Sequence, residues 1–229
     1  MKRIDTVVFD LDGTLLDTLE DLKDAVVYLQ EKYGYPVHTL DQVRRHVGNG
    51  IPFLIAKSIP GGEDNPDYRA FLDEYKAYYQ IHCNDKTRPY PGIPAMMAEL
   101  EKRGYHMAIV SNKADSAVKE LNRIYFSEYI RVAIGGNEEA GVRRKPAPDT
   151  VFTALDQLGV SGDRAIYVGD SEVDILTAAN SGLDCILCEW GFRQKEDLIR
   201  QGGRYFVSTA GEIPDMLDKF NADKEKNQE

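Results

Sequence analysis

The sequence has few cysteines, fewer basic than acidic residues, and no long apolar run. Its three cysteines, Cys83, Cys185 and Cys188, are an odd and sparse set, which favours reduced thiols over a disulfide framework. Lys and Arg number 28 against 38 Asp and Glu, and the formal net charge of -10 argues against a nucleic-acid groove, which needs a basic face. No apolar run approaches the roughly 20 residues of a membrane span. We therefore expect neither a nucleic-acid partner nor membrane contact.

The first residues also lack an apolar stretch long enough for a secretory signal, and no small-residue cleavage site follows them. We therefore expect a cytoplasmic protein. Cys185 and Cys188 form a C-x-x-C pair, so zinc and redox chemistry must be considered. They lie in a strand-like run, in which residues three apart point to opposite faces, and no second cysteine pair completes a tetrahedral site. Core packing is therefore the favoured interpretation.

Short apolar segments recur along the chain, and helical patterns of roughly 10 to 15 residues separate most of them. The predicted strands are residues 4–9, 106–110, 132–134, 165–168 and 185–188. Helices are predicted over residues 95–103, 116–125 and 148–158. This alternation predicts an α/β fold with a doubly wound parallel sheet, a Rossmann-like core with helices on both faces.

The stretch between the first two strands is longer than an ordinary crossover requires, and its pattern is helical throughout. Apolar residues recur there at helical spacing, as in residues 19–33 and 68–82. The chain returns through the segment NDKTRPYPGI, whose prolines and glycine are typical of a linker. We predict an α/β core of residues 1–16 and 89–229, an inserted helical cap of residues 17–88, and a frayed polar tail over residues 222–229.

Polar residues follow several predicted strands, at the edge of the sheet where ligands bind. Clustered carboxylates repel one another, so a stable site needs a cation, and all-oxygen ligands favour Mg²⁺ with a substrate phosphate. One carboxylate can attack phosphorus, and a second can move the proton, while hydroxyl, amide and lysine groups hold phosphate oxygens. The residues are Asp10, Asp12, Ser111, Asn112, Arg144, Lys145, Asp170 and Asp174. They predict phosphoryl chemistry on a small phosphorylated metabolite.

Four segments resemble, in order and spacing, the four motifs of the haloacid dehalogenase superfamily: DLDGTLLDT at 10–18, SNK at 111–113, RKPAPD at 144–149 and GDSEVD at 169–174. The resemblance implies that Asp10 is the nucleophile, that Asp12 is the acid/base, and that Lys145 is the charge clamp. Asp174 matches a position that supports the lysine or a metal-bound water. The expected metal ligands are Asp10, Asp12 (also through its backbone carbonyl), Asp170 and Asp174, and the expected phosphate-binding residues are Gly13, Thr14, Ser111 and Asn112.

The helical insert resembles the cap of the subgroup that contains phosphoglycolate phosphatases, pyrophosphatases and β-phosphoglucomutases. The segments VGNG at 47–50, SNK, and WGF at 190–192 look most like phosphoglycolate phosphatase. The glycine-rich turn around Asn49 follows Arg44 and Arg45, and exposed amides beside a guanidinium can bind a second anionic group of the substrate. We therefore add these three residues to the expected substrate-binding set.

Several alternatives stay open on the sequence alone. A β-phosphoglucomutase-like mutase or a pyrophosphatase would use the same core motifs, which therefore do not separate them from a phosphatase. A non-enzymatic phospho-receiver module also phosphorylates an aspartate at a strand end, but it explains neither Asp12 nor the cap. A dehalogenase is disfavoured because Asp12 and the acid of GDS favour a metal and phosphate. The substrate, and whether the protein is a monomer or a homodimer, are likewise open.

Overall fold

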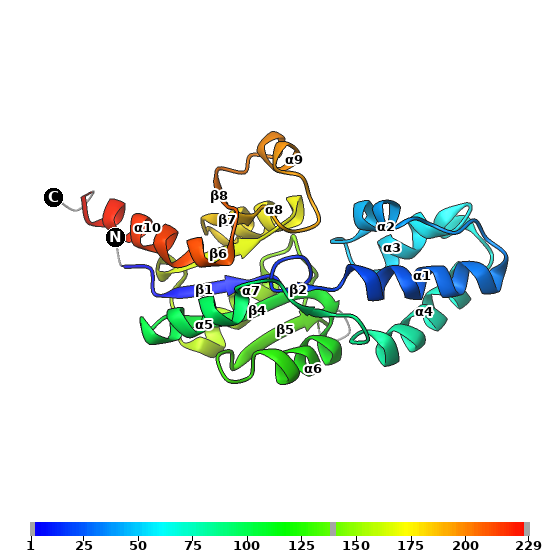
Figure 1. The fold of residues 1–229 in the computed structure, drawn as a ribbon, viewed down its shortest axis with the longest axis horizontal. Helices are drawn as coiled ribbons and strands as arrows, with labels where there is room; N and C mark the ends of the chain where they lie inside the picture. Colours follow the sequence, from blue (N-terminus) through cyan, green and yellow to red (C-terminus); the bar gives the residue numbers. More distant parts are fainter. Residues whose placement is uncertain (1–2, 138–140, 227–229) are drawn as a thin grey trace. The chain divides into compact units, whose positions relative to one another are not determined.

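The computed structural model describes residues 3–137 and 141–226. The chain divides into two compact units. The first, here called the core unit, comprises Met1–Leu15 and Pro89–Glu229, and the second, the helical unit, comprises Leu16–Arg88. Figure 1 shows strands and helices in the core unit, whereas the helical unit consists mainly of helices. The predicted cap, residues 17–88, lies within the helical unit.

The core unit is built on a sheet of six parallel strands in the order β5-β4-β1-β6-β7-β8 (Figure 1). The strands are β1 (Thr6–Phe9), β4 (His106–Ala114), β5 (Val132–Gly136), β6 (Ala165–Gly169), β7 (Cys185–Cys188) and β8 (Tyr205–Val207). Val8 of the central strand β1 lies opposite Ala108 of β4 and Tyr167 of β6. The predicted doubly wound parallel sheet is confirmed, and β8 is a strand that the sequence pattern did not predict.

Helices cover the sheet because its strands are apolar toward both faces. Val8 and Tyr167 pack in one cluster with Val151 of α7 and Ala178 of α8. Val7 points to the opposite face and is also fully buried, so that face is covered too. The helices of this unit are α5 (Ile93–Lys102), α6 (Asp115–Tyr125), α7 (Asp149–Leu158), α8 (Glu172–Ser181), α9 (Lys195–Arg200) and α10 (Ile213–Lys226). None of the helices in the described part of the chain has the length and apolar character of a membrane span.

The helical unit packs its helices around apolar side chains that recur at helical spacing. Leu22, Val26 and Leu29 of α1 are buried, as are Phe71 and Tyr75 of α4, and these two helices pack together. The helices are α1 (Leu19–Tyr33), α2 (Leu40–His46), α3 (Ile51–Ser58) and α4 (Tyr68–His82), with a short 3-10 helix at Gly62–Asp64. The chain enters the helical unit through β2 (Leu16–Asp17) and leaves it through β3 (Arg88–Pro89). These two short strands pair with each other.

The last helix packs against the start of the chain. Helix α10 extends to Lys226, and residues 227–229 lie outside the described part, so the fraying of the polar tail stays a prediction. The side chain of Asn221 bonds both backbone groups of Ile4, accepting from the N–H at 2.7 Å and donating to the carbonyl at 3.0 Å. Lys224 also donates to the carbonyl of Asp163 at 3.1 Å. These contacts fasten the end of the helix to the segments that precede β1 and β6.

Candidate active site

The loop after β1, residues 10–15 and here called the acidic loop, is fixed by a tight turn that returns toward the sheet. Asp10 donates its backbone N–H to the carbonyl of Val168 at 2.9 Å. Gly13 has a φ of +86°, and a Cβ at this position would lie 2.5 Å from Oδ2 of Asp170, so both its conformation and this contact require glycine. The next residue, Thr14, donates its hydroxyl to Oδ1 of Asp170 at 3.0 Å. The turn therefore ties the loop after β1 to Asp170, which follows the neighbouring strand β6.

Three buried carboxylates meet at this edge of the sheet. Asp10, Asp170 and Asp174 each offer an oxygen within 4.8 Å of the others. Burial, followed by the charge of Asp174, raises the pKa of Asp10 well above its ordinary value. The same two causes raise the pKa of Asp170 to about 7. Three like charges in so small a buried volume repel strongly, so the cluster favours a proton or a cation.

Lys145 is buried between two of these carboxylates. Its Nζ lies 2.8 Å from Oδ1 of Asp10 and 2.8 Å from Oδ1 of Asp174, and it donates to the hydroxyl of Tyr167 at 3.1 Å. Burial alone would lower the pKa of Lys145, but the charges of Asp10 and Asp174 outweigh it and hold the pKa above its ordinary value. The three ammonium hydrogens thus have three partners, and the charge points at the predicted nucleophile.

Asp174 is fully buried, and its oxygens are occupied by protein groups. Oδ1 accepts from Lys145 and, at 3.0 Å, from the hydroxyl of Tyr167. Oδ2 accepts from the N–H of Asp170 at 3.1 Å and from the N–H and hydroxyl of Ser171 at 3.0 and 2.7 Å. A carboxylate has about four lone-pair directions, and five donors fill them. The expected role of Asp174 as a metal ligand therefore fits this geometry poorly, and its alternative role, support of Lys145, fits well.

Asp12 lies beside β4 rather than in the three-carboxylate cluster. Its Oδ1 pairs with Nζ of Lys113 at 2.7 Å, and its Oδ2 lies 3.4 Å from the hydroxyl of Ser111. Asn112, expected to bind phosphate, donates its amide to the backbone carbonyl of Lys145 at 3.1 Å and so joins two loops of the site. No role was expected for Lys113 from the sequence, although it is the last residue of the SNK segment at 111–113.

The loop after β7, residues 189–194 and here called the β7 loop, contacts Thr14 and Asp170. Trp190 donates Nε1–H to the carbonyl of Thr14 at 3.0 Å. The N–H of Phe192 donates to Oδ2 of Asp170 at 2.7 Å. A Cβ at Gly191 would lie 2.3 Å from Cβ of Asp170, so only glycine lets the loop approach this closely. The segment WGF therefore supports the catalytic loops, a role that its apolar side chains did not indicate.

The carboxylate oxygens of Asp10 and Asp170 that still have lone pairs to give suit a hard divalent cation. Asp170 accepts one hydrogen bond at each oxygen, and Oδ1 of Asp10 accepts from Lys145 and, at 2.7 Å, from the N–H of Leu11. Both carboxylates therefore keep lone pairs for a metal. An all-oxygen donor set with two buried carboxylates fits Mg²⁺, which prefers few protein ligands and retains waters. Asp10 and Asp170 would hold it, together with the backbone carbonyl that the resemblance assigns to Asp12.

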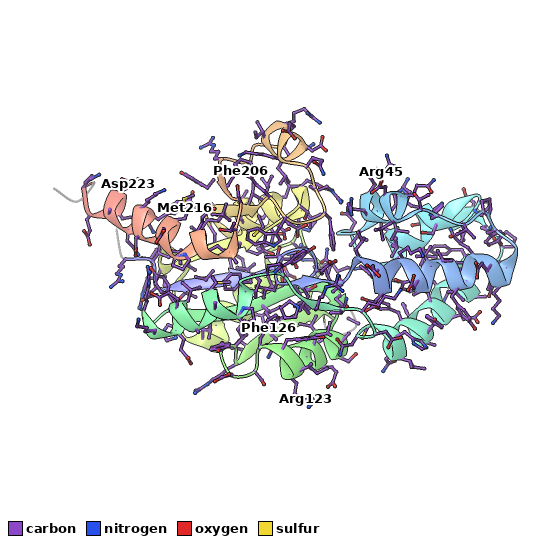
Figure 2. All side chains as sticks on the ribbon, in the orientation of Figure 1. Arg45, Arg123, Phe126, Phe206, Met216 and Asp223 are labelled. Atoms are coloured by element: carbon purple, nitrogen blue, oxygen red, sulfur yellow. The ribbon has the colours of Figure 1, made fainter. Side chains whose placement is uncertain are left out.

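The three residues expected to bind the distal group of the substrate lie in the helical unit. Arg44 pairs with Asp41 at 3.0 Å, and Arg45 is exposed on α2 (Figure 2). Asn49 is half-buried in the turn between α2 and α3. Their contact with a substrate stays a prediction.

Several known proteins are similar to this chain over most of its length. Residues 7–188 match the profile of the haloacid dehalogenase-like hydrolases. N-acetylmuramic acid 6-phosphate phosphatase of Pseudomonas aeruginosa is 30% identical over 223 residues, which are 96% of this chain and 98% of that protein. Phosphoglycolate phosphatase of Pseudomonas savastanoi pv. phaseolicola is 31% identical over 220 residues, 93% of this chain and 79% of that protein.

A solved structure is similar over nearly the whole chain as well. It is a candidate phosphoglycolate phosphatase from Lactobacillus delbrueckii subsp. bulgaricus, with a TM-score of 0.89 and 34% sequence identity, covering 94% of this chain and 99% of that one. The family match includes β1, β4, β6 and β7, the strands from which the acidic cluster and its supporting loops extend. The chain is therefore an enzyme that belongs to the haloacid dehalogenase-like hydrolase family.

Proposed function

We propose that the enzyme hydrolyses a small phosphate monoester through a phosphorylated Asp10, with Mg²⁺ as cofactor. The observation that supports this best is the contact of 2.8 Å between Asp10 and the buried ammonium of Lys145, beside the metal-compatible Asp170. A carboxylate held in this way has a fixed direction of attack, and the lysine offsets the charge that the incoming phosphate adds.

In the first step, an oxygen of Asp10 forms a bond to phosphorus, and the bond between phosphorus and the ester oxygen breaks. Asp12 gives a proton to the departing oxygen. In the second step, Asp12 takes a proton from water, the water oxygen forms a bond to phosphorus, and the bond between phosphorus and Asp10 breaks, which releases phosphate and restores the Asp10 carboxylate. Ser111 and the amides of the acidic loop hold the phosphate oxygens, and Lys145 offsets their charge from its place beside Asp10. Bound Mg²⁺ would neutralise charge on the transferring phosphoryl group.

The substrate we propose carries a carboxylate besides its phosphate. Two relatives are named for phosphoglycolate and for N-acetylmuramic acid 6-phosphate, and both compounds have this pair of groups. Phosphoglycolate is the first candidate, and the sugar acid is a second because that relative matches over 98% of its own length. Arg44, Arg45 and Asn49 are the residues we propose for the carboxylate, since a guanidinium and turn amides bind such a group.

The test is a measurement of phosphate release from a matched set of substrates. Phosphoglycolate, N-acetylmuramic acid 6-phosphate and N-acetylglucosamine 6-phosphate, which lacks the carboxylate, are compared with and without Mg²⁺. Pyrophosphate and glucose 1-phosphate test the two rival activities, and glucose 6-phosphate as product would establish a mutase. We expect release from one carboxylate-bearing ester to exceed release from the neutral sugar ester at least tenfold. Full activity in chelator would refute the metal site, and a stable phosphoprotein without turnover would establish a receiver module.

A further inference from the structure

Arg193 of the β7 loop and Glu172 of α8 form a two-pronged ion pair beside the acidic cluster. Nε of Arg193 lies 2.7 Å from Oε2 of Glu172, and one terminal nitrogen lies 3.1 Å from Oε1. The arginine side chain is 13% exposed and the glutamate 32% exposed. Fork-to-fork geometry with partial burial fixes direction as well as distance, which a single-point contact does not.

The pair joins the two segments that flank Asp170. Glu172 is the first residue of α8 and lies two residues after Asp170 in the chain. Arg193 directly follows Phe192, whose N–H donates to Oδ2 of Asp170 at 2.7 Å. Gly191 approaches Asp170 so closely that no side chain fits between them. The β7 loop therefore cannot move away from Asp170 without breaking the ion pair.

We propose that the Arg193–Glu172 pair is a positioning device for the metal site: it holds the β7 loop against α8 and so fixes the orientation of the Asp170 carboxylate toward a divalent cation. Neither residue touches the metal. This inference rests on the proposed function, because it assumes that Asp170 is a metal ligand.

Charge and geometry make opposite predictions for Arg193. A guanidinium near a cation site repels the cation, so its removal would strengthen metal binding if charge alone mattered. If the pair orients Asp170, its removal weakens metal binding instead, because partners outside the ligand shell commonly change affinity by 10- to 100-fold. Arg193→Lys separates the two effects further, since it keeps the charge and loses the fork.

The experiment is isothermal titration calorimetry of the metal-free protein with Mg²⁺. We compare the wild type with Arg193→Gln and Arg193→Lys, and with Arg103→Gln as control. Arg103, the residue directly after α5, makes ion pairs of similar length, at 2.7 Å to Glu99 and 2.9 Å to Asp218, and both partners lie outside the β7 loop. We expect both Arg193 variants to bind Mg²⁺ about tenfold more weakly, and the Arg103 variant to bind it like the wild type. Turnover at saturating Mg²⁺ should stay within about twofold for all of them.

Thermal unfolding of each variant separates positioning from general stability. If Arg193→Gln and Arg103→Gln lower the melting temperature similarly while only the first weakens metal binding, the positioning role is established. Unchanged or tighter Mg²⁺ binding by both Arg193 variants overturns the inference, even with the proposed function intact. A wild type that binds no Mg²⁺ overturns the proposed metal site itself. If Arg193→Gln does not fold, the milder Arg193→Lys still decides.

Discussion

The metal-free enzyme should lose stability as the pH rises from about 4 to about 7, the reverse of ordinary acid denaturation. The reason is Asp170, which is 1% exposed and whose pKa is raised from 3.8 to about 7 by burial and by the charge of Asp174. The folded protein therefore keeps a proton on this carboxyl at a pH where the unfolded chain has released it. Asp10, whose pKa is also raised, acts in the same direction.

The sign and size follow from proton linkage. A folded pKa above the unfolded one gives stabilisation that is complete below pH 3.8 and is lost as the pH rises through about 7. About three pH units at 1.36 kcal/mol each correspond to roughly 4 kcal/mol, a large part of the free energy of unfolding of a domain. Asp174 acts oppositely and at lower pH: its pKa is lowered, so its stabilisation is complete above 3.8 and is lost as the pH falls.

Urea unfolding in chelator at pH 5 and pH 8 measures this effect. Trp190 is the sole tryptophan of the sequence and lies in the core unit, so its fluorescence reports unfolding of that unit. We expect a lower free energy of unfolding at pH 8, and recovery on addition of Mg²⁺, which binds the ionised carboxylates. Asp170→Asn should flatten the dependence, because an amide does not titrate in this range, and its oxygen can still accept from the N–H of Phe192. A metal-free wild type that is no less stable at pH 8, or an unaltered slope in the variant, would refute the reasoning.

Four further substitutions test the site. Asp10→Asn should leave the circular dichroism spectrum unchanged and lower turnover more than a hundredfold, since an amide is a poor nucleophile; a smaller loss would exclude Asp10 as nucleophile. Tyr167→Phe leaves one N–H of the buried Lys145 ammonium without a partner and removes one of the donors to Asp174, so it should lower the free energy of unfolding by about 1–3 kcal/mol; unchanged urea unfolding would contradict this. Of Arg44→Ala and Arg45→Ala, one should raise KM for phosphoglycolate at least tenfold and leave KM for a neutral aryl phosphate unchanged. Equal effects on both substrates would show that these arginines do not bind the carboxylate.

The sequence predicts the fold and the centre of the site because both depend on short-range signals. Apolar runs predict the strands, and Asp10 and Asp170 follow β1 and β6 directly, so the parallel topology alone brings them to one edge. The three-residue strand β8 was missed because it is too short for a periodic pattern and has its place only through pairing with β7.

Tyr167 and Arg193 were missed for a different reason. Tyr167 lies in a buried apolar strand, where an aromatic residue is ordinary core, and its hydroxyl gains a role only because tertiary packing brings Lys145 within 3.1 Å. Arg193 lies in the β7 loop, where no apolar periodicity marks it, and its partner Glu172 lies 21 residues earlier, in the GDSEVD segment. No periodicity or spacing links such pairs, so only the folded structure identifies them.

The net charge of the buried site connects the metal with the predicted pH dependence. Four carboxylates, Asp10, Asp12, Asp170 and Asp174, face two ammonium groups, Lys113 and Lys145, and the Arg193–Glu172 pair adds no net charge. Four negative and two positive charges leave two negative charges, the amount that one Mg²⁺ neutralises. Without a metal, protons can neutralise these charges instead. The raised pKa values of Asp10 and Asp170 mean that these two carboxyls bind protons more readily than usual. Mg²⁺ and a pair of protons therefore compete to neutralise the same two negative charges. The affinity for Mg²⁺ should fall as the pH is lowered through 7.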